Sequence, residues 1–586
     1  MFALKNIYKM KNMKIGKRIL YIGILYTIFC CLMSIYFYNI NPYNFSYLEQ
    51  WSTFIYSFHY IREVLSQPGG IVHLLSSFIV QFFAIPWTGI IITSLLLTII
   101  SVMTDHLIYI CNHKTGFYPI SILPSIALSF LCFNVNFFYS EIIAIIIMLA
   151  LLIAAITIRS NRIKIIYIYI STPLLLIIAG PIASLYCILI ITITSICNYR
   201  KIIWYLVTPI ILYALALILV HKGFSGNTNS LLLPEGYFTL RLKAPSIMWL
   251  PWVMLIISIV IGLLLKHIKI KNQVSKSILY TAEITAIIVF AIYGMKHYID
   301  VDNEKFKIID QYSRNGNMES IISEVESTSS KNLLFQNYLN MALAEKGELG
   351  DHLFEYPCRD IQSIYVQGNK TPYLSAMLSD IYFSMGHMAL SQRSAFEANE
   401  SVGNFSPRML KRLVQINIIY GNYATAQKYI KILESTLFYK NWAKSQKKFL
   451  WNEISISNDS LLSSKRKCIF PDNRFSGIKG LDDDLLHIII SNPSHSATQQ
   501  YLCSLYLLSK DLTSFMKIIT TFYGTSALPK TLPIYFQEGI IFYAQGESET
   551  LDKYNINKSV IDRFNKFCQE PSTDKKSLWY FLRFTN

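Results

Sequence analysis

The stretch that decides the fold class is IIAIIIMLALLIAAI, Ile142 to Ile156, which contains no charged side chain. Apolar runs approaching about 20 residues cross a bilayer as single helices. Similar runs recur before about residue 295, whereas the chain after about residue 300 has the composition of a soluble protein. With 53% hydrophobic and 15% charged residues overall, the chain is predicted to be all-α. We predict a polytopic membrane domain over residues 1–298, followed by a soluble helical-repeat domain over residues 299–586.

About nine transmembrane helices are predicted in the membrane domain. The run from Ile165 to Cys197 is long for one span and short for two, and Gly180-Pro181 at its middle is a natural turn. We interpret it as two short spans. A single span is the alternative, and it would invert every later segment. The other predicted spans are residues 19–38, 89–110, 119–135, 142–158, 202–220, 249–265 and 278–295.

The basic residues predict the orientation of these spans. The net charge is +17, and much of the basic excess lies in short segments beside apolar runs, such as residues 159–164, 199–201 and 266–276. Because positively charged loops stay in the cytoplasm, the N-terminus is predicted inside and the C-terminal domain outside. No basic stripe with interleaved aromatic residues is present. We therefore expect membrane lipid as a partner and no nucleic acid.

A second informative stretch is FSYLEQWSTFIYSFHYIREVLSQPGGIVHLLSSFIVQFFAIPW, Phe45 to Trp87, which follows the first predicted span and is too polar to be another. Apolar residues recur every three or four positions on both sides of Gln67-Pro68-Gly69-Gly70, which is the period of a helix. The stretch predicts two amphipathic helices over residues 45–86, broken by the proline and glycines. Such helices lie in the membrane interface, here on the outer side.

The C-terminal domain has a recurrent layout of paired helices. Helices with apolar periodicity end at Gly347, Gly386, Gly421 and Gly546, and a second helix starts within a few residues of each. The distance from Gly386 to Gly421 is close to the tetratricopeptide period of about 34 residues. Stacked pairs of this kind form a solenoid that suits a protein or peptide partner. The polar region from Ser455 to Asp484 breaks the pattern and is predicted to be a loop insertion.

Cysteine spacing and short motifs provide no metal-ligand pattern and no evident cofactor, and whether a divalent metal binds stays open. The ten cysteines lack the spacing of zinc or redox sites. We find no phosphate-binding loop, nucleophile elbow or zinc motif. In an extracytoplasmic C-terminal domain one or two disulfides can form. The pairing stays open among Cys358, Cys468, Cys503 and Cys568.

Two segments carry a resemblance to a known family. They are LEQWSTFI…LSQPGGIVHLLSSFIVQFFAIPWTG (Leu48 to Gly89) and AFEANESVGNFSPRMLKRLVQINIIYGNYATAQKYIKILESTLFYKNWA (Ala395 to Ala443). They resemble an uncharacterised family of multi-pass membrane proteins, a domain of unknown function common in Bacteroides-type bacteria. The likeness covers the membrane half and the helical repeats. It implies a bacterial inner membrane location with a periplasmic C-terminal domain, and no activity.

The opening layout is also similar to that of membrane glycosyltransferases of the GT-C type. Those enzymes begin with a cytoplasmic N-terminus and one span, followed by an outer loop of two interfacial helices with a catalytic carboxylate. Glu49 stands where that carboxylate would be. The chain departs from the type because it has no Asp-Glu or Asp-Asp pair there and few spans. At the level of fold, the likeness implies a transferase that uses a polyprenyl-phosphate-linked donor.

Three residues of the outer stretch are candidate catalytic groups. Glu49 would deprotonate an acceptor hydroxyl as a sugar leaves a lipid phosphate. Its alternative role is to solvate the start of a helix, where negative charge suits the helix dipole. His59 and Glu63 lie one helical turn apart, and they are either a proton relay or a surface pair.

Other charged residues are candidates for phosphate or lipid-headgroup binding. Arg62, Arg241 and Lys243 are predicted on the outer side, where they would neutralise a lipid diphosphate or snorkel to headgroups. Glu141 lies at the outer end of an apolar span. An acidic residue there is a functional hypothesis, although a boundary residue needs no special role.

Two classes of function follow from these patterns. The first is an envelope transferase that acts on a lipid-linked donor in envelope glycan biogenesis. The second is a non-enzymatic membrane scaffold that recruits protein partners through its repeats. On one predicted helix of the repeats, Arg408, Lys411 and Arg412 share a face, which is either solvated or in contact with acidic partners.

Overall fold

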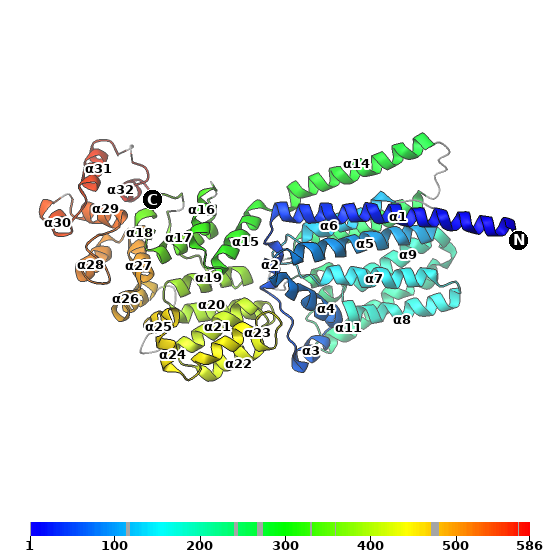
Figure 1. The fold of residues 1–586 in the computed structure, drawn as a ribbon, viewed down its shortest axis with the longest axis horizontal. Coiled ribbons are helices and arrows are strands. Elements are labelled where there is room, and N and C mark those ends of the chain that lie inside the picture. The colour runs from blue at the N-terminus through cyan, green and yellow to red at the C-terminus, as the bar shows by residue number, and fades with distance from the viewer. Residues whose placement is uncertain are drawn as a thin grey trace. The chain divides into compact units, whose positions relative to one another are not determined.

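The computed structural model describes residues 2–112, 118–238, 244–265, 273–328, 331–357, 359–469, 480–545, 547–571 and 574–585. Within these ranges the chain is helical, with two isolated β-bridges and no strand of a sheet. The predicted all-α fold class is confirmed. The chain forms two compact units: unit 1 comprises Met1–Glu304 with Thr436–Phe438, and unit 2 comprises Lys305–Ser435 with Tyr439–Asn586 (Figure 1).

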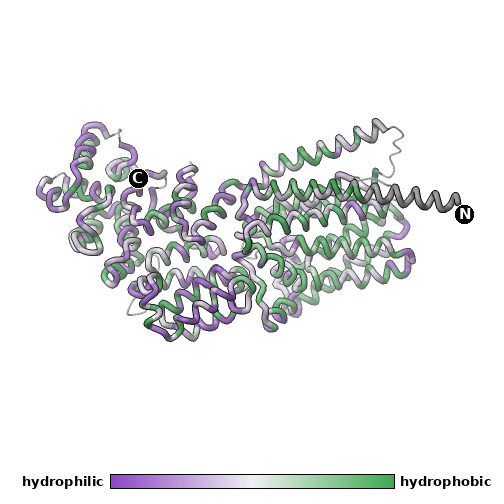
Figure 2. The backbone as a smooth tube through the Cα atoms, viewed as in Figure 1, coloured by the Kyte–Doolittle hydropathy of each residue, from purple (hydrophilic) through white to green (hydrophobic). Residues whose placement is uncertain are grey.

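Unit 1 contains the apolar helices, which are green in Figure 2. Seven helices of the described residues are long and apolar enough to cross a membrane, and Pro119–Leu131 and Ile182–Cys197 are apolar but shorter. This composition indicates a membrane protein, and the count of nine spans stays a prediction. The main helices are α1 (Phe2–Ile40), α5 (Thr88–Asn112), α6 (Leu123–Leu131), α7 (Ser140–Thr157), α8 (Asn161–Ala179), α9 (Ile182–Asn198), α11 (Val207–His221), α13 (Leu250–Leu264) and α14 (Gln273–Tyr298).

The long apolar run after residue 165 folds as two helices. Helix α8 ends at Ala179, α9 begins at Ile182, and the two helices pack against each other. Gly180 has a φ of 69°, which glycine adopts without steric cost. Pro181 follows at the turn. The run therefore divides at the position that its sequence predicts.

The stretch from Phe45 to Trp87 differs from the predicted pair of helices. It contains α2 (Asn44–Glu49), α3 (Phe58–Leu65), α4 (Gly70–Val80) and the 3-10 turn η1 (Gln81–Ala84). The prediction of one continuous helix before Gln67 is wrong between α2 and α3, where the chain is non-helical. In this segment Trp51, Thr53 and Ile55 are buried and the residues between them are more exposed. That period of two belongs to extended chain.

Unit 2 is built from shorter helices that pack in consecutive pairs, such as α19 with α20 and α21 with α22. Gly347, Gly386 and Gly421 have φ values of 79°, 85° and 77° at the turns after helices, while Gly546 lies outside the described residues. The main helices are α15 (Val301–Arg314), α16 (Met318–Glu326), α17 (Leu333–Lys346), α19 (Pro372–Ser384), α20 (Met388–Ser401), α21 (Pro407–Ile419), α22 (Tyr423–Glu434), α26 (Leu481–Ser491), α27 (Ser496–Leu508), α28 (Leu512–Phe522), α29 (Ile534–Tyr543), α31 (Lys558–Gln569) and α32 (Leu578–Phe584).

The polar region after Ser455 is helical where the structure describes it, which corrects the predicted loop. Helices α24 (Glu453–Ser457) and α25 (Ser460–Arg466) lie there, and residues 470–479 are outside the described ranges. The Asn452 side chain accepts from Ser455 N at 3.1 Å, and the Asp459 side chain accepts from Leu462 N at 3.0 Å. These polar residues cap short helices. Because several short helices need several caps, the segment has a polar composition that resembles a loop.

Candidate functional site

Aromatic packing brings α2 and the start of α7 to the same end of unit 1. The ring of Phe45 in α2 lies 5.5 Å from that of Phe83 in η1, which lies 5.2 Å from that of Tyr139. Asn44 Nδ2 donates to the carbonyl of Cys132 at 3.0 Å. These contacts fix the short helix after the first apolar helix against the first turn of α7.

Glu141, in the first turn of α7, is fully buried at this end. Trp252 Nε1, from the first turn of α13, donates to Glu141 Oε1 at 3.0 Å. The other carboxylate oxygen, Oε2, has no hydrogen-bond partner in the structure. A buried polar atom left unpaired costs free energy, and acidic groups within a membrane domain are expensive. Glu283 Oε2 in α14 also has no partner, but its residue is only partly buried, so we take the fully buried Glu141 as the sign of a site in unit 1.

Further polar groups gather around the first turn of α7. His73 Nδ1 in α4 lies 3.4 Å from Ser140 Oγ. The carbonyl of Tyr237 accepts from Phe138 N at 3.1 Å, and the Tyr237 hydroxyl donates to Ala179 O at the end of α8. We name Glu141, His73, Ser140, Tyr237 and Trp252 the Glu141 cluster. It joins α4, α7, the end of α8, the start of α13 and the loop before it.

The beginning of α4 is held close to the α8–α9 turn. Gly69 N donates to the carbonyl of Ile177 at 2.8 Å. A Cβ on Gly69 would lie 3.5 Å from Gly180 N, and Gly69 itself has a φ of 80°. This is an ordinary van der Waals distance, so glycine is required at Gly69 and Gly180 by their left-handed backbone and not by lack of space. The Gln67-Pro68-Gly69-Gly70 segment thus positions α4, and with it His73, beside α7.

Glu49 is also buried, with 3% of its surface exposed, at the last position of α2. The alternative that it solvates the start of a helix is wrong, because the residue ends its helix and lies inside the unit. Gln50 and Thr53 next to it are buried too. The outer stretch therefore contributes a second buried carboxyl at the end of unit 1 that holds the Glu141 cluster.

The other candidates of the outer stretch lie apart from this buried region. The His59 side chain is 92% exposed and lies 3.9 Å from Glu63 on α3, and Arg62 is exposed on the same helix. An exposed pair and a buried Glu49 do not line one enclosed site. Arg241 and Lys243 lie outside the described residues.

In unit 2, Arg408 and Arg412 belong to an internal ion network, which corrects the expected solvated or partner-binding face. Arg408 Nη1 lies 2.8 Å from Asp310 Oδ1, and its Nη2 contacts Asp380. Arg412 Nη2 lies 2.7 Å from the second Asp380 oxygen. Burial alone would raise the pKa of Asp380, but the two guanidinium groups lower it. Tyr338 donates to Asp310 at 2.7 Å.

A second buried network in unit 2 crosses from α25 to α27. Lys465 Nζ lies 2.8 Å from His495 Nε2, and His495 Nδ1 lies 2.7 Å from Thr498 Oγ1. The Thr498 hydroxyl donates to the carbonyl of Met385 at 2.7 Å. Because the Thr498 hydrogen is used on Met385, His495 Nδ1 donates to Thr498, and its Nε2 accepts from Lys465. The imidazole is therefore neutral. Burial lowers the pKa of Lys465.

We expect unit 2 to lose stability on acidification below about pH 6.5. Burial, and then the Lys465 charge, lower the pKa of His495 from 6.5 to about 3. The unfolded chain therefore binds this proton first, so stability is complete above pH 6.5 and falls below it. The slope of about 1.4 kcal/mol per pH unit gives a loss of about 2 kcal/mol by pH 5. The loss of unfolding free energy is measured by the hydrogen-exchange protection of α27 in the full chain at each pH. An identical pH dependence in His495→Gln would contradict the assignment.

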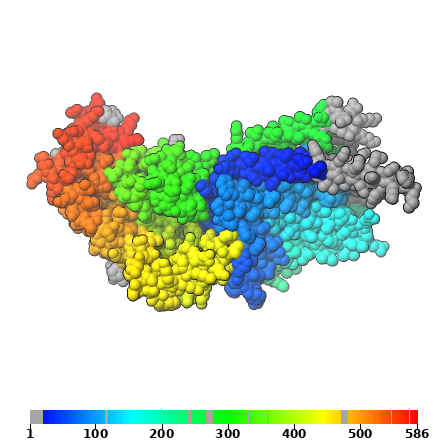
Figure 3. Space-filling view, viewed as in Figure 1, coloured from blue at the N-terminus to red at the C-terminus, as the bar shows by residue number. Residues whose placement is uncertain are grey.

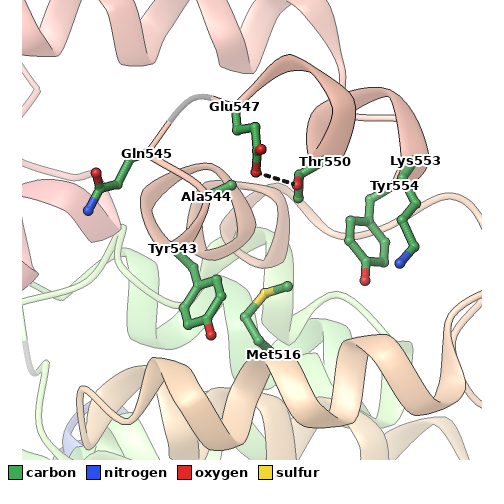
Figure 4. Close-up of a pocket in the computed structure, with 8 residues that line it drawn as sticks. All are labelled: Met516, Tyr543, Ala544, Gln545, Glu547, Thr550, Lys553 and Tyr554. Carbon is green, nitrogen blue, oxygen red and sulfur yellow. Dashed lines mark hydrogen bonds between the residues drawn. The ribbon is translucent and has the colours of Figure 1, made fainter.

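Unit 2 also carries an open pocket of about 320 Å³ between α28 and the turn from α29 to α30 (Ser548–Lys553). Thr550 Oγ1 donates to Glu547 at 3.1 Å across its rim (Figure 4). None of the described side chains that line it leaves a buried polar atom without a partner. We therefore place the candidate site at the Glu141 cluster. The pocket is lined by Met516, Tyr543, Ala544, Gln545, Glu547, Thr550, Lys553 and Tyr554.

The cysteines of unit 2 that the structure describes carry free thiols. Cys468 and Cys503 are buried and Cys568 is exposed. Burial raises the pKa of the Cys503 thiol to about 12, and such a thiol is unreactive at neutral pH. Cys358 lies outside the described residues. None of the described cysteines of this unit therefore forms one of the disulfides that the sequence allows.

Comparison with known proteins gives one match. No curated protein and no solved structure matches the chain. A family model described as a family of unknown function, DUF6057, matches residues 17–585, which include both units. The match thus covers the apolar helices, the Glu141 cluster and the paired helices of unit 2. The chain belongs to the DUF6057 family.

Proposed function

We propose that the protein is a membrane transferase of the GT-C type that uses a lipid-linked sugar donor at the outer face of the bacterial inner membrane. The observation that carries the proposal is the pair of buried carboxyl groups, Glu49 and Glu141, at one end of unit 1. One follows the first apolar helix and the other begins α7. Ionisable groups at such positions are expensive to bury and serve function.

In the proposed reaction, Glu49 acts as the general base. It takes the proton of an acceptor hydroxyl while that oxygen attacks the anomeric carbon of the donor sugar. The bond from this carbon to the phosphate oxygen breaks, and polyprenyl phosphate leaves with the bonding electron pair. Glu141, whose Oε2 has no partner, would accept a hydrogen bond from a sugar hydroxyl.

Basic side chains would bind the donor phosphate. Arg62, on the exposed face of α3, is one candidate. Arg241 and Lys243, which are outside the described residues, come between α11 and α13 in the sequence and stay candidates by that position. Cationic groups stabilise a leaving phosphate because their attraction strengthens as charge develops on it.

The basic loops and the Bacteroides-type family resemblance support the proposed location. With the N-terminus in the cytoplasm, an odd number of spans places unit 2 in the periplasm, on the same side as the outer stretch. That orientation brings Glu49 to the face where lipid-linked donors are used in envelope glycan biogenesis. A cysteine introduced at Asn315 would report the orientation by its labelling from outside.

Replacing Glu49 with glutamine is expected to abolish an envelope glycan product while protein level is unchanged. The amide keeps the size of the side chain but does not accept the proton, and loss of a general base costs about 10²–10⁴-fold in rate. The measurement is the glycan profile of a strain that carries only the variant, with immunoblotting of membranes. A wild-type profile in this strain would refute the assignment of Glu49.

A second candidate function is a membrane scaffold that recruits a protein through unit 2. The consecutive helix pairs and their left-handed glycine turns favour it, because tetratricopeptide-like repeats of this layout bind peptides. This function predicts a normal phenotype for Glu49→Gln. It also predicts that the full chain, purified in detergent, retains one specific membrane protein that a chain with altered unit 2 surfaces does not retain.

A further inference from the structure

One part of the unit 2 surface combines exposed lysines with exposed large apolar side chains. It follows α22 and comprises α23 (Lys440–Gln446), the turn η7 (Lys447–Phe449) and α24. Trp451 is 61% exposed and Ile454 is 74% exposed. We define the lysine–tryptophan surface as Lys440, Lys444, Lys448, Trp451 and Ile454. This part of the chain is yellow on the face seen in Figure 3.

The lysines of this surface have no acidic partner among the described residues. Lys440, Lys444 and Lys448 are exposed. Lys440 and Lys444 lie one helical turn apart on α23, and Lys448 follows in η7. The two nearby acids pair with cations other than these three lysines. Glu434 pairs with Lys447 at 2.6 Å, and Glu453 pairs with Arg466. The surface therefore presents uncompensated positive charge.

Trp451 is held outward by its surroundings. Its backbone has a φ of 55°, a left-handed conformation that is unfavourable for a bulky residue. The following residue, Asn452, caps α24, and the Trp451 ring lies 5.8 Å from that of Tyr423. The turn between η7 and α24 thus presents a large indole at the surface, where burial against a partner would be favourable.

We propose that the lysine–tryptophan surface binds the anionic headgroup layer of a phospholipid membrane. Tryptophan prefers the membrane interface, and each lysine near an anionic surface contributes about 1 kcal/mol. Apolar contact and charge attraction add in such binding. Unit 2 is tethered to the bilayer by a short link, because α14, an apolar helix long enough to span, ends at Tyr298 and unit 2 begins at Lys305. Exposed lysine charges on a surface without a pocket suit a layer of headgroups better than they suit a small ligand of defined shape.

The test uses the full chain in lipid nanodiscs, either of pure phosphatidylcholine or with one third phosphatidylglycerol, followed by hydrogen–deuterium exchange. We expect residues 440–454 to exchange several-fold more slowly in the anionic discs. The protection should disappear at about 0.5 M salt, where the Debye length falls to about 4 Å. It should also be lost in the variant K440E/K444E/K448E and reduced in W451A.

A matched control is K558E/K566E, which changes two exposed lysines of α31 outside the surface. This variant should keep the lipid-dependent protection. Equal exchange in neutral and anionic discs would overturn the proposal. Protection that is independent of lipid charge but requires two chains per disc would also overturn it, and would identify a second copy as the occupant. Normal exchange elsewhere in unit 2 shows that the triple variant is folded.

Discussion

Replacing Glu141 with glutamine is expected to lower the proposed transferase activity by about 10²–10³-fold, the range for loss of one preorganised polar group at a reaction site. The amide oxygen of glutamine still accepts from Trp252 Nε1, which lies 3.0 Å from Glu141 Oε1 in the native chain. The buried volume is also unchanged. The fold and the membrane level should therefore be retained, while the free carboxylate oxygen is lost.

The measurement is the glycan profile of a strain that carries only Glu141→Gln, together with its protein level. The matched control is Glu283→Gln in α14, a partly buried glutamate whose Oε2 also has no hydrogen-bond partner but which lies outside the Glu141 cluster. This control should behave as the wild type. Retained activity in Glu141→Gln would remove Glu141 from the mechanism, and a reduced protein level would mean that the carboxyl serves folding.

The sequence predicts the helices of unit 1 well because their cause is local. An apolar run leaves its backbone groups no partner in lipid except each other, so it forms a helix. The division of the run from Ile165 to Cys197 was equally predictable, since Gly180-Pro181 permits a turn that few other residue pairs allow. The paired helices of unit 2 follow from the same kind of local signal.

The candidate site was less predictable because burial is a tertiary property. Glu49 is in a polar stretch, and its sequence gives no sign that α4, α5 and η1 pack around α2. Residues 51–57 have apolar positions that fit a helical stripe, but their side chains alternate between the interior and the surface. Glu141 was visible as an acid at the end of an apolar run, whereas its bond to Trp252 joins residues far apart in sequence.

The same reason explains the error at Arg408. Its charged neighbours along the helix indicate a solvated face, and the two carboxylates that bind it come from α15 and α19. Only the packing of three helices makes this arginine an interior residue. Its sequence gives the charge but not the partners.

Replacing Arg408 with leucine is expected to destabilise unit 2 by about 3–5 kcal/mol, the cost of removing one partner from a buried ion pair. The guanidinium contacts both Asp310 and Asp380, and the Asp310 side chain is only 1% exposed. Without Arg408 these carboxylates would remain buried with less compensating charge, although Arg314 and Arg412 still contact one each. Hydrogen-exchange protection of α19 and α21 in the full chain measures the loss.

A matched control separates burial from the mere loss of an arginine. Arg393 pairs with Glu397 at 3.0 Å, but its side chain is 52% exposed, so Arg393→Leu should cost at most about 1 kcal/mol. The triple variant D310N/D380N/R408L should recover part of the stability, because it removes the carboxylate charges together with Arg408, while Arg314 and Arg412 each lose an acidic partner. Equal effects of Arg393→Leu and Arg408→Leu would show that the network contributes little. A triple variant no more stable than Arg408→Leu would place the cost in packing instead of charge.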